Sequence, residues 1–117
     1  MSYSGPLLTV PPAVVTQSTV LGGPFPCLAY ATMAVDVNVS AVSGTSPSLQ
    51  LALQRRGDDG VWYPVWTPSA VTAAGVASTS VGPGCATAAV LTDQARLLAT
   101  VTGTTPSFTV SVSVVGR

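Results

Sequence analysis

The sequence contains no lysine, no glutamate and no histidine. Charged residues make up 7% of the chain, against about 25% in an ordinary soluble domain, and the formal net charge is zero. Without a basic patch or an acidic tail, the chain lacks the electrostatics that nucleic-acid binding requires. Because so neutral a surface gives copies little mutual repulsion, we expect partners or other copies of the chain to cover much of it.

The missing residue types also bear on catalysis. General acid–base catalysis usually employs histidine, glutamate, lysine or a tuned aspartate, and only aspartate is present here. Serine and threonine lack a histidine or lysine base that would activate them as nucleophiles. Asp58 and Asp59, in the stretch RRGDDG, could offer oxygen ligands to calcium, but aspartate and glycine at this spacing favour a turn. We therefore expect no enzyme, no cofactor and no metal site.

Two cysteines, Cys27 and Cys85, allow one disulfide, which would contribute roughly 4 kcal/mol by closing a long loop. The first fifteen residues carry no positive charge and are interrupted by Pro6, Pro11 and Pro12, which is unlike a secretory signal. The same prolines exclude a membrane helix there. We therefore expect synthesis in the cytoplasm and no membrane partner, and we favour two free, largely buried thiols over the disulfide.

Apolar and polar residues alternate through the centre and the end of the chain. The alternation is strict from Met33 to Ala41, resumes from Leu49 to Gln54 and recurs from Phe108 to Val114. A period of two is typical of half-buried strands, and no stretch sustains the 3.6-residue period of a helix. Shorter candidate strands lie near residues 14–20, 61–66, 76–81, 88–91 and 97–101. The pattern predicts an all-β fold: an antiparallel β-sandwich, Ig-like or jelly-roll-like, with about seven or eight strands.

Residues 1–26 contain five of the ten prolines. Proline interrupts helices and cannot donate a backbone hydrogen bond within a central strand. The sequence therefore predicts an extended N-terminal arm, rich in proline and glycine, with at most one or two short edge strands. A single β-sandwich domain is expected over residues 27–117. We expect the arm to add a strand to the sheet edge of a neighbouring molecule, and to be removable without unfolding the domain.

The phrase VSGTSPS, at residues 42–48, recurs 59 positions later as VTGTTPS, at residues 101–107. Glycine adopts backbone conformations that other residues resist, and proline directs the residue before it towards extended structure. Each copy therefore predicts a hairpin loop of about four or five residues between two strands. The sequence leaves open whether the two hairpins are structurally equivalent or one good turn was used twice.

Trp62, Tyr63 and Trp66 form the aromatic cluster of the chain. Aromatic strips on a sandwich can bind sugars or anchor an interface, whereas a tryptophan directly after a turn is more often a core residue. We expect Trp62 to lie in the core, with interface and ligand-binding roles as the alternatives. Arg55 and Arg56 could pair across an interface, although a solvated turn is the simpler interpretation.

Two segments, VNVSAVSGTSPSLQLALQRRGDDGVWYPV and ARLLATVTGTTPSFTVSVSVVGR, resemble a family of small proteins of tailed bacteriophages, especially those of actinobacteria. These proteins are encoded among the head and structural genes. The shared pattern is a strand, the Ser-Gly-Thr-Ser-Pro turn, a second strand, the Asp-Asp-Gly turn with its tryptophan, and a closing Val-Gly-Arg. The resemblance implies a virion structural protein: a capsid decoration, or minor capsid, protein on the outer surface of the phage head, assembled in the host cytoplasm.

The resemblance also implies the partners of the chain. They are the major capsid protein, whose shell the decoration protein would stabilise, and further copies of the chain in a trimer or other small oligomer. Another phage structural component, such as a head fibre or tail protein, and a carbohydrate-binding β-sandwich module are the alternatives. The candidate interface residues lie in the arm and around the RRGDDG turn. They are Tyr3, Leu7, Leu8, Val10, Val14, Val15, Arg55, Arg56 and Trp66.

Overall fold

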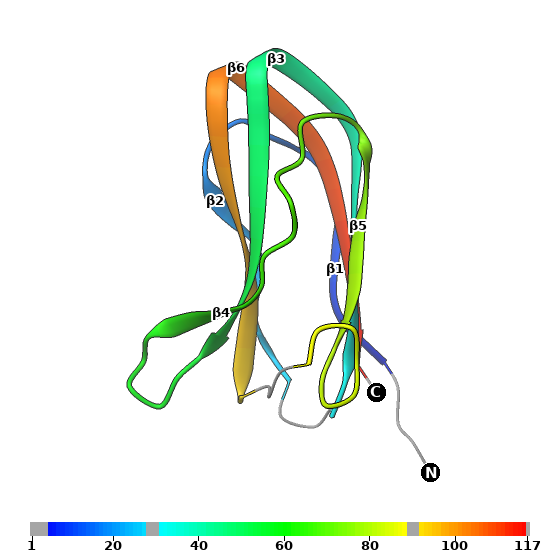
Figure 1. The fold of residues 1–117 in the computed structure, drawn as a ribbon, viewed down its shortest axis with the longest axis vertical. Coiled ribbons are helices and arrows are strands. Elements are labelled where there is room, and N and C mark those ends of the chain that lie inside the picture. The colour runs from blue at the N-terminus through cyan, green and yellow to red at the C-terminus, as the bar shows by residue number, and fades with distance from the viewer. Residues whose placement is uncertain (1–4, 28–30, 89–91, 117) are drawn as a thin grey trace.

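A computed structural model describes residues 5–27, 31–88 and 92–116 of the chain. These residues form one antiparallel sheet of six strands, and they contain no helix (Figure 1). The strands are β1 (Gly5–Val15), β2 (Thr19–Pro26), β3 (Met33–Arg56), β4 (Trp62–Trp66), β5 (Gly75–Val81) and β6 (Gln94–Gly116). The predicted all-β class is confirmed.

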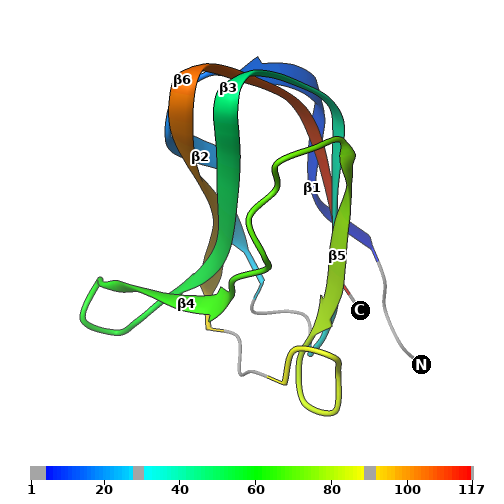
Figure 2. The same cartoon turned by 45° about the horizontal axis from the view of Figure 1, so that its top comes forward.

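Strands β3 and β6 organise the sheet. They are 24 and 23 residues long and pair along their whole length, from Met33 opposite Gly116 to Arg55 opposite Ala95. Both strands bend near their middle, so the sheet folds over at one end and its two halves face each other (Figures 1 and 2).

Two further strands flank each half of the folded sheet. In one half, β2 pairs with the start of β6 and β4 pairs with the end of β3. In the other half, β1 pairs with the end of β6 and β5 pairs with the start of β3. We refer to them as the β2–β4 half and the β1–β5 half. Within the described residues, β1, β2, β4 and β5 are therefore the edges of the sheet.

The core lies between the two halves. Every second residue of β3 is buried from Met33 to Val39 and again from Leu49 to Leu53, and β6 shows the same pattern. Because alternate side chains of a strand share a face, this pattern makes the inner face apolar and leaves the polar residues on the outer face. Burial of a large side chain such as Phe108 contributes roughly 1.5–3 kcal/mol.

The repeated phrases form the bend of the sheet. Gly44 and Gly103 have φ angles of 113° and 120°, and Ser46 and Thr105 have φ angles of 48° and 45°. A Cβ atom on Gly44 would lie 2.7 Å from the carbonyl oxygen of Thr105, and one on Gly103 would lie 2.8 Å from that of Ser46. The two copies therefore pack against each other, and only glycine fits both the space and the backbone angle.

The prediction of two hairpin loops is wrong. The ladder between β3 and β6 shifts register on both sides of Thr45, and the chain continues in the same strand through each copy. The residues with positive φ bend each strand over, as a bulge does. The two arms of β3 then lie in facing halves (Figure 1), and each arm pairs with β6 instead of pairing with the other arm as in a hairpin. The predicted strands before and after each phrase consequently merge, and the described residues contain six strands rather than seven or eight. The predicted strand at 88–91 falls largely outside the described residues.

The bends belong to a larger internal repeat. The order β1–β2–β3 is followed by the order β4–β5–β6, and exchanging the two sets reproduces the pairing pattern of the sheet. A Gly-Pro dipeptide at residues 23–24 and 82–83 repeats with the same 59-residue spacing as the phrases. The two copies are thus structurally equivalent units that pair with each other, which answers the question that the sequence left open.

The N-terminal segment is part of the sheet. β1 and β2 both pair with β6, and they contribute the buried side chains of Val15 and Phe25. The separate arm is therefore not confirmed for the described residues, although the segment is extended as predicted. Its prolines are accommodated because both strands lie at edges, with register shifts at Pro11–Pro12 and around Pro24.

Candidate functional site

Charge is concentrated at one end of the molecule, opposite the bend. Of the charged side chains that the structure describes, all but Asp36 lie on the β3–β4 hairpin or at the start of β6. We call this group the charged end. It consists of Arg55, Arg56, Asp58, Asp59, Asp93 and Arg96. The rest of the described surface is almost uncharged.

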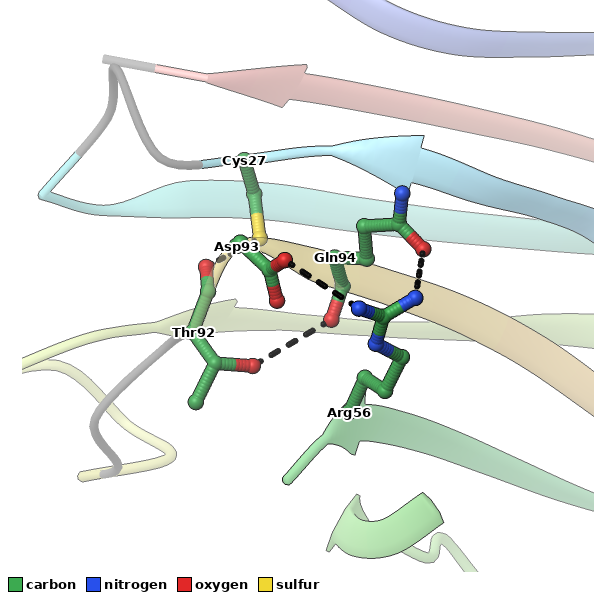
Figure 3. A network of polar contacts seen from close by, with 5 residues as sticks. All are labelled: Cys27, Arg56, Thr92, Asp93 and Gln94. Atoms are coloured by element: carbon green, nitrogen blue, oxygen red, sulfur yellow. Dashed lines mark hydrogen bonds and ion pairs between the residues drawn. The ribbon is translucent and has the colours of Figure 1, made fainter. Parts of the chain in front are cut away.

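Arg56 connects β3 to the start of β6 within the charged end (Figure 3). Its Nη2 lies 3.7 Å from Oδ2 of Asp93, and its Nη1 donates to Oε1 of Gln94 at 3.4 Å. The arginine and aspartate side chains are 44% and 52% exposed, so their ion pair contributes at most about 1 kcal/mol. The hydroxyl of Thr92 donates to the carbonyl oxygen of Gln94 at 3.4 Å. These contacts hold the strand ends together.

The two cysteines are free thiols, as we favoured from the sequence. Cys27 is buried and donates from Sγ to the carbonyl oxygen of Thr92 at 3.0 Å (Figure 3), whereas Cys85 is only partly buried. Burial, and secondly the carboxylate of Asp93, raises the pKa of the Cys27 thiol. A thiol with a raised pKa stays protonated at neutral pH and is a poor nucleophile, so Cys27 has a structural environment.

The RRGDDG stretch forms the turn of the β3–β4 hairpin, as predicted, and the hairpin projects from the body (Figures 1 and 2). Its backbone N–H of Gly57 donates to the carbonyl oxygen of Val61 at 2.8 Å. Asp59 accepts from the Val61 N–H at 2.9 Å and from the Tyr63 hydroxyl at 2.6 Å. These bonds, the one from Tyr63 first, lower the pKa of Asp59. Within the described residues, no three acidic, cysteine or histidine side chains gather as metal ligands would.

The tryptophans are half-buried. The guanidinium carbon of Arg96 lies 4.4 Å from the ring centroid of Trp62. Nε of Arg96 donates to Oε1 of Gln54 at 2.8 Å. Trp66 packs against the core. The expected core position of Trp62 therefore holds only in part, because an arginine covers one face of the ring. The ring face under Arg96 is therefore not open for stacking against a sugar.

The outer face of the β1–β5 half carries a groove of about 330 Å³. It crosses all four strands of this half: the flanking strands supply valine and proline, and the central strands supply mainly small polar residues. Its lining consists of Thr9, Val10, Pro11, Pro12, Asp36, Val37, Asn38, Val76, Ser111, Val112 and Ser113. Asp36 is the charged member of this lining, and its side chain has no hydrogen bond or ion pair with any described residue.

The predicted interface residues of the N-terminal segment have different environments. Val14 is 65% exposed on β1, whereas its neighbour Val15 is buried in the core. Leu7, Leu8 and Val10 are half-buried and pack against the core, and Val10 also lines the groove. Tyr3 lies outside the described residues. The segment therefore contributes to the core first and to the outer surface second.

The predicted interface residues of the second group lie in the β2–β4 half. Arg55 and Trp66 are partly buried, and Arg56 is exposed in its ion pair with Asp93. They lie on the opposite half from the groove. Sequence reasoning missed the groove residues Asn38 and Ser111, whose only signal was their outward position on period-two strands.

The chain matches no protein-family model, no curated protein and no solved structure. The part that the structure describes also holds no helix with the length and apolar character needed to cross a bilayer. The fold and the surface define the described part of the chain as all-β, with its charge concentrated at one end and a single further charge at Asp36. Its other half presents a nearly neutral sheet face with a groove.

Proposed function

We propose that the chain is a virion structural protein, a decoration or minor capsid protein that binds the outer surface of a phage head and stabilises its shell. The distribution of charge supports this proposal most directly. Asp36 is the single charged side chain described on the β1–β5 half, whose outer face has a groove lined largely by valine and proline. Such a face is cheap to desolvate against another protein, because few charges lose their hydration on docking.

The fold is consistent with this role. In the proposal, the two facing halves act as the layers of a β-sandwich, Ig-like or jelly-roll-like, because side chains from both halves enter one core. A single core spanning both layers makes the outer face rigid, so docking would cost little conformational entropy. Many copies on a repeating shell would add avidity to individually weak contacts. The resemblance of the repeated phrases and the Asp-Asp-Gly hairpin to phage head proteins supports the assignment to the virion.

The test begins with purified virions of the phage that encodes the chain. We expect mass spectrometry to detect the protein in them, and a cryo-EM map to place it on the outer face of the head. A map with the protein on the tail would replace the head assignment by the tail alternative. Its absence from the particles would remove the virion role altogether.

A binding assay tests the docking face itself. Particles that lack the protein are incubated with purified variants, and the bound fraction is measured. Asn38→Arg places a large charge in the groove at an exposed position and should lower occupancy by about tenfold or more, because the charge would be desolvated on docking. Thr100→Arg, an equal change at an exposed position of the other half, is the matched control and should bind normally. Normal binding of the Asn38 variant would show that the groove face does not dock.

A further inference from the structure

The four edge strands of the sheet differ in how well they can accept another strand. β1 contains three prolines, β2 contains two and β4 contains one in only five residues. Proline lacks the N–H group that a new ladder needs, and natural proteins use it to block edge pairing. β5, with the sequence GVASTSV, contains neither proline nor charge. Among the described edges, β5 alone has no such protection.

The outward backbone groups of β5 can be assigned from its hydrogen bonds. β5 pairs with β3 without any register shift, from Val39 opposite Gly75 to Met33 opposite Val81. The carbonyl oxygen of Ser80 faces away from β3, because it accepts the N–H of Thr87 at 2.9 Å. Since alternate residues of an antiparallel strand point the same way, the backbone groups of Val76 and Ser78 also face away from β3. No described backbone group pairs with them.

We propose that β5 pairs antiparallel with β5 of a second copy of this chain, with Ala77 of one copy opposite Ala77 of the other. In this register, Val76 of each copy lies opposite Ser78 of the other, and the outward N–H and C=O groups of both residues are satisfied. The two alanines occupy a non-hydrogen-bonded site, where the Cα atoms approach to about 4.5 Å and small side chains fit.

Two features favour a second copy as the occupant. Residues 61–92 contain no charged side chain, so two β5 edges do not repel each other. Thr87 covers the edge at Ser80, which leaves only a short free stretch. A long partner strand would collide with Thr87, whereas two short stretches centred on Ala77 match each other about a two-fold axis.

The two-fold axis of such a pair is perpendicular to the joined sheet, so both outer grooves lie on the same side. If the proposed docking function holds, the dimer would therefore be bivalent towards a repeating surface. This consequence rests on the proposed function, but the pairing itself does not.

The experiment measures the mass of the full chain by analytical ultracentrifugation over a range of concentrations. We expect the wild type to sediment at twice the chain mass of 11.7 kDa. Val76→Lys adds a charge at a side chain that is already 72% exposed, and Ser78→Pro removes an outward N–H. Both should raise the dimer dissociation constant by about tenfold or more, because pairing groups are lost or a charge is brought to the edge. Val14→Lys is the matched control on β1, at a side chain 65% exposed, and should remain dimeric.

Each alternative outcome overturns the pairing. A wild type that stays monomeric at its highest soluble concentration excludes the second copy as the occupant. A dimer that survives in Val76→Lys excludes β5 as the contact; this variant decides if Ser78→Pro fails to fold. Equal dissociation of the Val14 control would show that any added surface charge suffices. Asn38→Arg should keep the dimer mass, so a failure of docking is distinguishable from a failure of pairing.

Discussion

The β2–β4 half and the β1–β5 half have equivalent strand arrangements and different surfaces. Outward side chains of the first contact each other within the chain: Arg96 donates to Gln54, and Arg56 contacts Asp93 and Gln94. Those of the second include Asp36 and Asn38, which have no described side-chain partner. The repeat retains the inward apolar residues and the bend, because the core depends on them, whereas outward positions are free to differ. In the proposed function, the outward residues of the β1–β5 half form the docking surface.

Several side chains of the charged end have partners within the chain, unlike the outward residues just named in the β1–β5 half. Asp59 is hydrogen-bonded by Tyr63 within the hairpin turn, and Arg96 lies over the ring of Trp62. The β1–β5 half instead leaves a carboxylate in its groove and backbone groups along β5 without a described partner. Groups that have no partner within the chain are available for binding, so the β1–β5 half is the side that faces partners in both proposals.

Removal of residues 1–26 should destabilise the fold more than any other change considered, because it takes one flanking strand from each half. The truncation also deletes the buried side chains of Val15 and Phe25. Burial of each contributes roughly 1.5–3 kcal/mol, against a total stability of about 5–15 kcal/mol for a domain. We expect loss of the cooperative thermal transition by circular dichroism. A truncated chain that melts cooperatively near the wild-type Tm would restore the detachable arm.

Substitutions at the bend test the equivalence of the two copies. Gly44→Ala and Gly103→Ala each bring a Cβ within 3 Å of backbone oxygen at a positive φ, so each should lower the free energy of unfolding by about 2–4 kcal/mol. Urea denaturation measures both losses, which should agree within about 1 kcal/mol. The control is Gly75→Ala, whose Cβ would meet no atom within 4 Å. A large loss at one glycine and none at the other would contradict the equivalence.

Truncation of outward polar side chains should affect the free energy of unfolding less than the bend substitutions do, and it should do so differently in the two halves. Arg96→Met removes the guanidinium that lies over the Trp62 ring and the hydrogen bond to Gln54, and we expect a loss of about 1 kcal/mol. Asn38→Ala, on the β1–β5 half, should change the free energy of unfolding by no more than about 0.5 kcal/mol. Chemical denaturation of the pair provides the measurement. Equal losses of unfolding free energy would mean that the outward residues of the β1–β5 half also stabilise the fold.

The smallest effect concerns the pH dependence of the hairpin. The Tyr63 hydroxyl and the Val61 N–H lower the pKa of Asp59, so their contribution to folding is present above the unfolded pKa and is lost as pH falls through the folded one. NMR titration of the carboxyl carbon should give a midpoint below the ordinary aspartate value. Tyr63→Phe removes the largest cause and should move the midpoint upward. An unchanged midpoint would show that the hydroxyl does not bond the carboxylate in solution.

Period-two alternation determined much of the fold. It identified the inward faces of Met33–Val39, Leu49–Leu53 and Phe108–Val114, because side-chain direction in a strand follows from local geometry alone. The chemistry of RRGDDG likewise predicted its turn. Of the groove, however, the predicted interface residues included only Val10. The other lining residues come together from four strands, and their neighbours depend on pairing between distant parts of the chain.

What the sequence alone determined is therefore local: which residues face inward, where the hairpin turns, and that the surface carries little charge. Tertiary structure decided between a bent strand and a hairpin at VSGTSPS, because Gly44 is constrained by the carbonyl oxygen of Thr105 in the other copy. It also decided that the proline-rich segment joins the sheet, since its partner strand β6 begins at Gln94, far along the chain. Local preferences allow either outcome at both places, and only the pairing of distant strands selects one.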